Sequence, residues 1–488
     1  MTSALFRVDP RDDVAVALRD LAAGEDAGVR VAEPVPSGHK VALRPIAAGE
    51  TVRKFGFPIG RALTDIAAGD HVHVHNLATA LRERGDYAWQ PHTDGAPAGA
   101  EAAEGFLGYR RADGRVGTRN EIWVIPTVGC VARIAEKIAA RAAVRHAGRV
   151  DGIHAFAHPF GCSQLGDDLD GTRALLASLA SHPNAGGVLI LGLGCESNQL
   201  SELLPGIADG ANVRALGAQA AGDEIEEGLA LVDALVETAA QAKRAPVPLS
   251  ALVLGVKCGG SDGFSGLTAN PLVGRMSDAV TRAGGTAILT EIPEIFGAEH
   301  LLMERAADEA VFAAIGRLVN GFKAYFTGYG EGLAENPSPG NKAGGITTLE
   351  EKSLGAVQKG GHAVVTDVLS YGARASRPGL TLLEAPGNDA VSSTALAAAG
   401  ATVILFTTGR GTPLGFPVPT IKIASNSDLA RRKPGWIDFD AGRVLDEGFD
   451  PSTEALLETI RAVASGRETA AERNDEREIA LWKRGVTL

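Results

Sequence analysis

Apolar runs alternate with amphipathic stretches through most of the chain after residue 106. In a first series, short apolar runs precede helical patterns, at 122–125 before 131–146, at 153–157 before 172–181, and at 188–191 before 198–204. A second series of apolar runs covers 252–256, 287–289, 363–365 and 403–406. Such alternation is typical of mostly parallel sheets covered by helices. The pattern therefore predicts an α/β fold with two units, 106–248 and 249–488.

The first 88 residues follow a different pattern, in which short strands are punctuated by glycine turns. Leu21, Ile46 and Ile66 each precede the tripeptide Ala-Ala-Gly. Turns at such close spacing predict a small β domain over residues 1–88. Residues 89–105 are rich in Pro, Gly and Ala without apolar periodicity, and we expect them to form a linker.

Composition and charge narrow the classes of partner. The 488 residues carry a net charge of -12, which argues against a nucleic-acid partner. The N-terminus lacks the pattern of a signal peptide, and no run of about 18 apolar residues occurs. We therefore expect a cytoplasmic protein with no membrane partner, and the sequence leaves a homo-oligomer open. Four cysteines are too few for a disulfide framework, so free thiols or metal ligation remain.

Each cysteine stands where a predicted strand ends, beside glycine. Cys130, Cys162 and Cys195 follow a glycine directly, and Cys258 precedes two glycines. Ligands bind at this edge of α/β sheets, although a small apolar side chain also suits tight packing there. Three converging thiols could hold an iron–sulfur cluster with an open iron, but their spacing fits no compact cluster motif.

Residues 70–76 place imidazoles at alternate positions. If this tract is a strand, His71, His73 and His75 share one face. Imidazoles at that spacing, with oxygen ligands, suit Fe(II), Mn(II) or Zn(II). A solvated polar strand face is the plain alternative.

Several glycine-rich loops carry further candidate site residues. Asp262, in the loop after the run 252–256, and Glu196 could each act as a general base or metal ligand, although single carboxylates are more often caps or ion-pair partners. Arg410 could clasp a carboxylate through two hydrogen bonds or simply pair with a surface acid. Candidates for recognition of a polyhydroxy acid lie in three further places. Asn341 and Lys342 belong to the run 336–348, which is too rich in Pro and Gly to predict a helix. Asn388 and Asp389 stand at the start of a predicted helix, and Lys422 lies in the run 420–426.

Ordered runs along the chain resemble the altronate and galactarate dehydratase family, and within it the altronate branch. Among them are Gly117-Thr-Arg-Asn120, Cys258-Gly-Gly-Ser-Asp-Gly263, Asn336-Pro-Ser-Pro-Gly-Asn-Lys342 and Gly387-Asn-Asp-Ala-Val391. Residues 38–76 resemble the SAF (β-clip) domain that opens these enzymes. The resemblance implies dehydration of D-altronate to 2-dehydro-3-deoxy-D-gluconate, a step of hexuronate catabolism, with Fe(II) or Mn(II) as the metal.

The run 412–420 departs from the altronate pattern, since Phe416 and Pro417 stand where a second glycine is usual. Galactarate or another aldarate is therefore an alternative substrate, and a sulfolactate-type sulfo-lyase is an alternative activity. A sugar-acid-binding regulator is the alternative that is not an enzyme.

These patterns combine into one hypothesis for the site. Removal of a proton α to a carboxylate needs concentrated positive charge, which a divalent metal supplies. We expect metal ligands among His73, His75, Cys195 and Cys258, catalytic groups among His75, Asp262 and Glu196, and substrate contacts from the six residues Asn341, Lys342, Asn388, Asp389, Arg410 and Lys422. The unit 249–488 is the expected catalytic body, and the small domain a lid over it.

Overall fold

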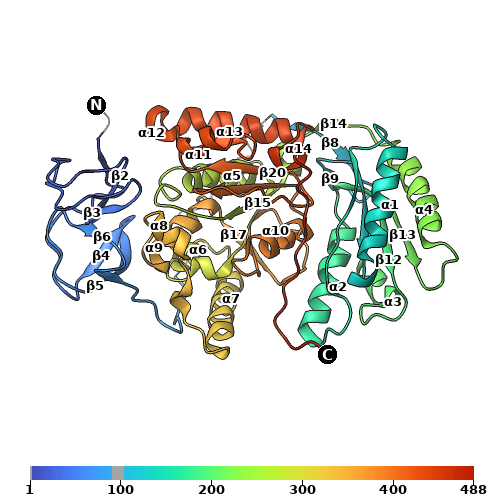
Figure 1. Ribbon diagram of the computed structural model, residues 1–488, viewed down its shortest axis with the longest axis horizontal. Coiled ribbons are helices and arrows are strands. Elements are labelled where there is room, and N and C mark those ends of the chain that lie inside the picture. The colour runs from blue at the N-terminus through green and yellow to red at the C-terminus, as the bar shows by residue number, and fades with distance from the viewer. Residues whose placement is uncertain (1–2, 91–103) are drawn as a thin grey trace.

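The computed structural model describes residues 3–90 and 104–488, so most of the expected linker lies outside the described residues. Three bodies follow one another along the longest axis of the molecule (Figure 1). The N-terminal β domain (residues 3–88) lies at one end, the second α/β unit (249–488) in the middle, and the first α/β unit (106–248) at the other end. The predicted α/β class, with a small β domain and two units of mostly parallel sheet, is confirmed.

The N-terminal β domain consists of two small antiparallel sheets. One has the order β1 (Leu5–Phe6), β2 (Val14–Ala17), β3 (Lys40–Ala42), β6 (His71–Val72), and the other the order β4 (Thr51–Lys54), β5 (Phe57–Ala62), β7 (Leu77–Ala78). The histidine tract is not a strand throughout, because β6 ends at Val72. Asn76 Oδ1 accepts a hydrogen bond from His73 N at 2.9 Å and closes a turn there.

The first α/β unit has a four-stranded parallel sheet. Its order is β11 (Gly152–Ala155), β10 (Glu121–Pro126), β12 (Ala185–Gly192), β13 (Val213–Gly217). Its helices are α1 (Ala132–Arg145), α2 (Gly166–Ala180), α3 (Leu200–Leu203) and α4 (Glu224–Ala239). Helices α1 and α4 pack together on the sheet, whereas α2 lies towards the second unit (Figure 1). A small antiparallel sheet adjoins it, with the order β14 (Ala245–Val247), β8 (Phe106–Arg110), β9 (Val116–Gly117).

The second α/β unit is built on a seven-stranded parallel sheet. Its order is β17 (Val365–Leu369), β18 (Gly379–Leu383), β16 (Thr286–Leu289), β15 (Val253–Cys258), β19 (Val403–Thr408), β20 (Thr420–Ala424), β21 (Phe439–Asp440). The chain leaves β15 in one direction and later returns to its other side as β19. The carboxyl ends of these two strands thus form a topological switch point, where ligands bind in open α/β sheets.

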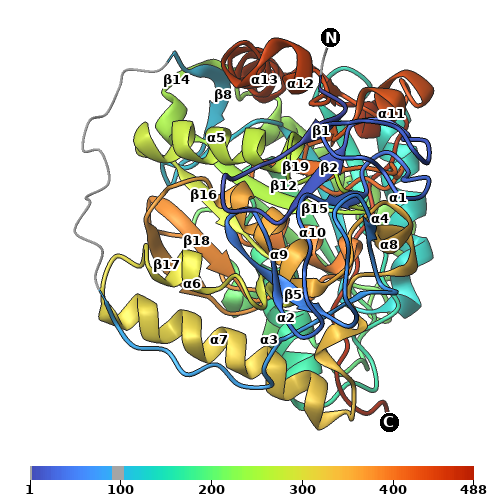
Figure 2. The ribbon, with the colours of Figure 1, turned by 90° about the vertical axis from the view of Figure 1, so that its left-hand side faces the viewer.

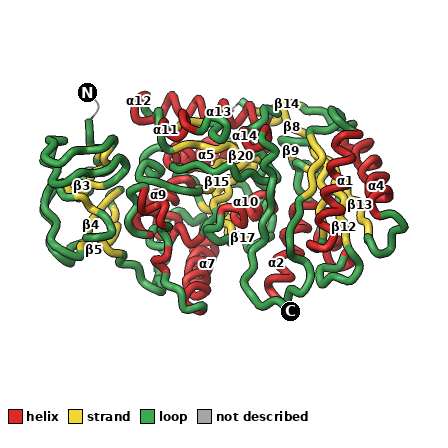
Figure 3. The backbone as a smooth tube through the Cα atoms, in the orientation of Figure 1, coloured by secondary structure: helices red, strands yellow, loops and turns green. Residues whose placement is uncertain are grey.

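Helices and loops cover both faces of this central sheet (Figure 3). Helices α5 (Ala269–Arg282) and α13 (Phe449–Ala464) pack on one side and α10 (Asp389–Ala398) on the other, where it also meets α2. The remaining helices are α6 (His300–Met303), α7 (Glu309–Gly328), α8 (Pro339–Ala343), α9 (Leu349–Ala356), α11 (Ser427–Arg432), α12 (Val444–Glu447) and α14 (Ala470–Arg473). Among the described residues, no helix is long and apolar enough to span a bilayer.

The N-terminal β domain covers one face of the second unit (Figure 2). A buried ionic triad joins the two. Glu351 on α9 accepts hydrogen bonds from Lys40 Nζ at 2.9 Å and from Lys54 Nζ at 2.8 Å. All three side chains are at most 2% exposed. Burial opposes ionisation of Glu351, but the two ammonium groups outweigh it and lower its pKa to about 2, while burial lowers the pKa of Lys40 to about 8.

Candidate functional site

Helix α8 lies at the junction of the N-terminal β domain and the second unit. Its helical conformation corrects the expectation that 336–348 is too rich in Pro and Gly for a helix. Pro339 occupies the first turn, where its missing N–H costs nothing, and Ser338 and Asn341 exchange the hydrogen bonds of a capping box. The helix ends after only five residues, at Gly344.

Two histidines of the N-terminal β domain bind the carbonyl groups of α8. Nε2 of His73 lies 2.9 Å from Lys342 O, and Nε2 of His39 lies 3.4 Å from Ala343 O. A carbonyl can only accept, so each Nε2 must carry the hydrogen, and Nδ1 of each neutral ring is an acceptor; that of His39 accepts from His71 Nε2, whereas that of His73 keeps an available lone pair. Metal-binding histidines usually have this arrangement, in which the outer nitrogen donates to a carbonyl and the inner one is free to ligate.

The Nδ1 atoms of His39 and His73 lie within a compact cluster of imidazoles. Nδ1 of His39 is 3.0 Å from Nε2 of His71, and the ring centres of His39 and His73 are 5.0 Å apart. The exposed ring of His75 lies 5.6 Å from that of His71. Burial lowers the pKa values of His39 and His73, and burial together with the neighbouring histidines lowers that of His71 to about 3. At neutral pH these rings are uncharged, the form in which imidazole binds metals.

Two cationic residues belong to, or contact, the helix that binds these histidines. Arg410, in the loop after β19, is exposed and donates from Nη1 to Gly340 O at 3.3 Å. Lys342 is half-buried on α8 itself, next to the residues that bind His73 and His39. An arginine and a lysine at the edge of a neutral histidine cluster favour an anionic ligand.

Asp262 positions the loops of the switch point. Its Oδ1 accepts from Ser265 N at 3.0 Å, Ser265 Oγ at 2.9 Å and Ser425 Oγ at 2.8 Å, and its Oδ2 accepts from Asn426 Nδ2 at 3.0 Å. Burial raises the pKa of this carboxyl, while the hydrogen bonds oppose the rise. Because these four donors occupy both oxygens, the contacts of Asp262 tie the loop after β15 to the end of β20.

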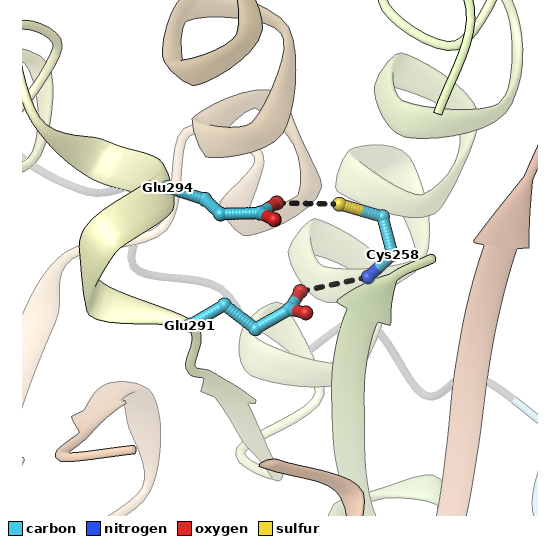
Figure 4. A group of neighbouring side chains, drawn as sticks. All are labelled: Cys258, Glu291 and Glu294. Carbon is cyan, nitrogen blue, oxygen red and sulfur yellow. Dashed lines mark hydrogen bonds between the residues drawn. The ribbon is translucent and has the colours of Figure 1, made fainter. Parts of the chain in front are cut away.

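A second cluster is buried at the carboxyl ends of β15 and β16 (Figure 4). Cys258 Sγ lies 3.2 Å from Glu294 Oε2, and Cys258 N donates to Glu291 Oε2 at 2.8 Å. In the part of the chain that the structure describes, these three residues are the one group of at least three donors that all lie within 4.8 Å of one another, and no three imidazoles of the histidine cluster lie within that limit. Glu291 also has a left-handed φ of 66°, which is strained for a residue with a side chain.

Three buried lysines already neutralise this cluster. Lys257 Nζ lies 3.0 Å from Glu291 Oε1 and 2.6 Å from Asp389 Oδ1; Lys352 Nζ lies 2.8 Å from Glu294 Oε1; Lys359 Nζ lies 2.9 Å from Cys258 Sγ. Burial opposes the charge on each lysine, but neighbouring acidic groups outweigh it and raise all three pKa values: carboxylates first for Lys257 and Lys352, and the Cys258 sulfur first for Lys359. Burial raises the pKa of the Cys258 thiol to about 12. A neutral thiol and carboxylates with ammonium partners suit a divalent ion less well than the neutral imidazoles do.

Lys352 connects the two clusters. Besides Glu294, it donates to Asn336 Oδ1 at 2.9 Å and to Asn341 Oδ1 at 3.1 Å, and Asn341 belongs to α8. The histidine cluster and the lysine–carboxylate cluster therefore lie on either side of one short helix.

The other predicted site residues are placed less directly. Asn388 caps α10 by accepting from Ala390 N and Val391 N, and Asp389 pairs with Lys257. Lys422 is buried and donates to Pro413 O rather than reaching Arg410, and burial lowers its pKa to about 8.

Glu196 and Cys195 lie in the first α/β unit. In Figure 1 the second unit separates this part of the molecule from the histidines, so one chain does not bring these two residues to His73 and His75. Glu196 accepts from Thr127 Oγ1 at 2.6 Å and from two backbone N–H groups, and these bonds outweigh burial and lower its pKa.

Sequence reasoning missed His39, Lys352 and Lys359, and it considered Lys257 as a base but left it out of the site. His39 lies 32 residues before its partner His71, a separation that no local motif reveals. A lysine inside the apolar run 252–258 was the clearest signal, because a buried lysine requires a carboxylate partner.

Comparison with known proteins gives matches along the whole chain. Family models match three consecutive regions: "Altronate/galactarate dehydratase SAF domain" at 3–80, "D-galactarate dehydratase/Altronate hydrolase, second domain" at 108–240, and "D-galactarate/Altronate dehydratase, C-terminal" at 249–487. The chain is 51% identical to an altronate dehydratase of Escherichia coli (strain K12), over 99% of both chains. It is 48% identical to an altronate dehydratase of Bacillus subtilis (strain 168), over 99% of this chain and 100% of the other. Identity to the galactarate dehydratase (L-threo-forming) of E. coli is 35%, over 96% and 94%.

Proposed function

Because the chain belongs to the D-galactarate/altronate dehydratase family, and its altronate dehydratase relatives are hydro-lyases, we propose that it dehydrates D-altronate to 2-dehydro-3-deoxy-D-gluconate. The C2 proton and the C3 hydroxyl leave together as one water, and the resulting enol tautomerises to the 2-keto acid. The two altronate dehydratases support this substrate, since each aligns over nearly the entire chain.

The proposal depends on one observation: helix α8 contacts neutral histidines of the N-terminal β domain as well as cationic residues of the second unit. His73 presents an available Nδ1 atom, and His39 Nδ1 accepts a hydrogen bond from His71 Nε2 at 3.0 Å. Lys342 belongs to α8, and Arg410 contacts α8 through Gly340 O. A sugar acid offers a carboxylate to the cations and hydroxyl groups to a metal or an imidazole.

We assign the metal to this histidine cluster. His39, His71 and His73 would hold Fe(II) or Mn(II), and His75 lies close enough to assist. When bound, the ion supplies Lewis acidity that makes the C2 proton removable and the hydroxyl a better leaving group. Cys258, Glu291 and Glu294 remain an alternative set of metal ligands. The buried ammonium groups beside them disfavour a divalent cation there.

Residues of the chain supply the remaining steps. Arg410 and Lys342 orient the carboxylate, and the exposed imidazole of His75 accepts the C2 proton. Asn341 fixes α8 by donating from Nδ2 to Ser261 O at 2.8 Å. Asp262 holds the loops that carry Ser261 and Asn426, and acts through them rather than on the substrate.

The test is turnover by protein stripped of metal and resupplied anaerobically with Fe(II), Mn(II), Mg(II) or Zn(II). D-altronate and galactarate are supplied in parallel, and the 2-keto-3-deoxy acid is measured. We expect Fe(II) or Mn(II) to restore activity on altronate in the wild type and in His362→Ala, a matched control with an exposed imidazole, but not in His75→Ala.

The rival functions give different results in the same experiment. Preference for galactarate would identify an aldarate dehydratase, and sulfite release from sulfolactate would identify a sulfo-lyase. Binding of altronate without turnover under any metal would favour a regulator and contradict the proposal.

A further inference from the structure

Three exposed thiols lie at one edge of the first α/β unit. Cys130, Cys162 and Cys195 follow the strands β10, β11 and β12, which are neighbours in the order β11-β10-β12. All three strands are parallel, so their carboxyl ends meet at the same edge. The three cysteines are thus brought to one place by the topology, although they are far apart in sequence.

The loops that carry these cysteines are bonded to one another. Gly129 N, next to Cys130, donates to Phe160 O at 2.8 Å. Asn198 N, three residues after Cys195, donates to Gly161 O at 2.9 Å, and Gly161 directly precedes Cys162. Gly161 approaches the first loop so closely that a Cβ there would lie 2.0 Å from Thr127 O. The loops therefore form one ordered surface rather than three independent segments.

The polar groups around this surface hold the loops, and those that contact the thiols are neutral: Gln219 at Cys195 and Ser163 Oγ at Cys162. Glu196 accepts from Thr127 Oγ1, Leu193 N and Gly194 N, and it thereby joins the loop of Cys195 to that of Cys130. Gln219 Nε2 points to Cys195 Sγ at 3.4 Å. Cys195 has a neutral amide beside it, in contrast to the ammonium group that contacts Cys258.

A single ion would require the three sulfurs to move closer together. A tetrahedral zinc with Zn–S bonds of about 2.3 Å holds its sulfurs about 3.8 Å apart. Over residues 3–90 and 104–488, the three cysteines do not form a group of donors within 4.8 Å of one another. An iron–sulfur cluster spreads its thiolates over several irons and accepts a wider triangle of ligands.

We propose that Cys130, Cys162 and Cys195 bind a [4Fe–4S] cluster at the edge of the first α/β unit. Three thiolates ligate three irons, and the fourth iron faces solvent with an oxygen ligand such as water. Glu196 is a positioning residue for this cluster, because its bonds fix the loops of two ligands. The proposal is independent of the metal at the histidine cluster, since the second unit lies between the two sites (Figure 1).

The test uses the full chain, reconstituted anaerobically with Fe(III), sulfide and a thiol that reduces half of the iron to Fe(II), and then desalted. The measurements are iron and acid-labile sulfide per chain, the visible absorption of thiolate–iron charge transfer, and the electron paramagnetic resonance spectrum after reduction. We expect about four irons and four sulfides per chain in the wild type. Cys130→Ser, Cys162→Ser and Cys195→Ser should each lose the sulfide and the absorption, whereas Cys258→Ser, the matched control, should keep both.

Two results would overturn the proposal. One is wild-type protein that takes up no acid-labile sulfide, including the case in which it binds zinc alone. The other is a triple serine variant that retains as much sulfide as the wild type while keeping its circular dichroism spectrum. Altronate turnover by the triple variant with Fe(II) or Mn(II) is measured separately, so that failure of either proposed site is recognised without reference to the other.

Discussion

Replacement of Glu351 by Gln tests whether the buried triad holds the N-terminal β domain against the second unit. The variant leaves Lys40 and Lys54 buried without a carboxylate. In the folded protein the pKa of Glu351 falls from 4.5 to about 2. This fall means that the fold stabilises the ionised carboxylate by roughly 3 kcal/mol. Removing one partner of a buried ion pair typically costs about 3–5 kcal/mol. We therefore expect docking to weaken by about 3 kcal/mol, or roughly a hundredfold in the opening equilibrium.

Hydrogen exchange of the amides in residues 38–54 reports this opening directly, without assuming that the whole chain unfolds in one step. The amides should exchange about a hundredfold faster in Glu351→Gln at neutral pH, where exchange follows the opening equilibrium. Glu33→Gln, an exposed acid in the same domain, is the control and should leave the rates unchanged.

A fully apolar triad separates the loss of charge pairing from the loss of packing. Lys40→Met, Lys54→Met and Glu351→Leu together remove all three charges, and exchange should return towards the wild-type rate. Equal exchange in wild type and Glu351→Gln would refute the reasoning.

The sign of the pH dependence follows from the same group. Glu351 has a lower pKa in the folded state than the usual 4.5, so its contribution is complete above pH 4.5 and is lost as the pH falls towards 2. The difference in melting temperature between wild type and Glu351→Gln should narrow over that interval. A difference that stayed constant down to pH 2 would contradict the ionic account.

Further substitutions test the junction. His39→Ala and His73→Ala should each weaken Mn(II) binding at least tenfold in a competition titration, since each removes a proposed ligand, whereas His362→Ala should bind as the wild type does. Arg410→Met should raise KM for altronate about tenfold to a hundredfold with a smaller change in kcat, because a charge-assisted hydrogen bond contributes about 1.5–3 kcal/mol; an unchanged KM would remove it from the site. Asp262→Asn should lower the melting temperature because an amide cannot accept the four hydrogen bonds that the carboxylate accepts, and an unchanged melting temperature would show that the loops are held otherwise.

The sequence predicted the fold better than the site. Periodicity located β10, α1, β12 and β15 to within a few residues, because buried parallel strands and amphipathic helices leave strong local patterns. The expected family is confirmed by relatives that align over the entire chain. The domain limits at 88, 105 and 248 stay predictions.

The site was harder because its residues meet only through tertiary structure. His39 directly precedes β3 whereas His71 begins β6, and Lys359 lies 101 residues from the Cys258 thiol that it contacts. Helix α8 was missed for a local reason, since Pro and Gly suggested a loop. The serine before Pro339 and the asparagine three positions after that serine were the available signal for a capped first turn.

Helix α8 also has a consequence for the order in which the protein becomes functional. A helix of five residues has almost no stability alone, because so few hydrogen bonds do not offset the unfavourable free energy of forming the first turn. Its last carbonyls, at Lys342 and Ala343, are bound by side chains of the N-terminal β domain, and Gly340 O by Arg410. The helix is therefore expected to form only after the two bodies meet, so that neither body displays a finished site during synthesis, and acquisition of the metal becomes the final event of maturation.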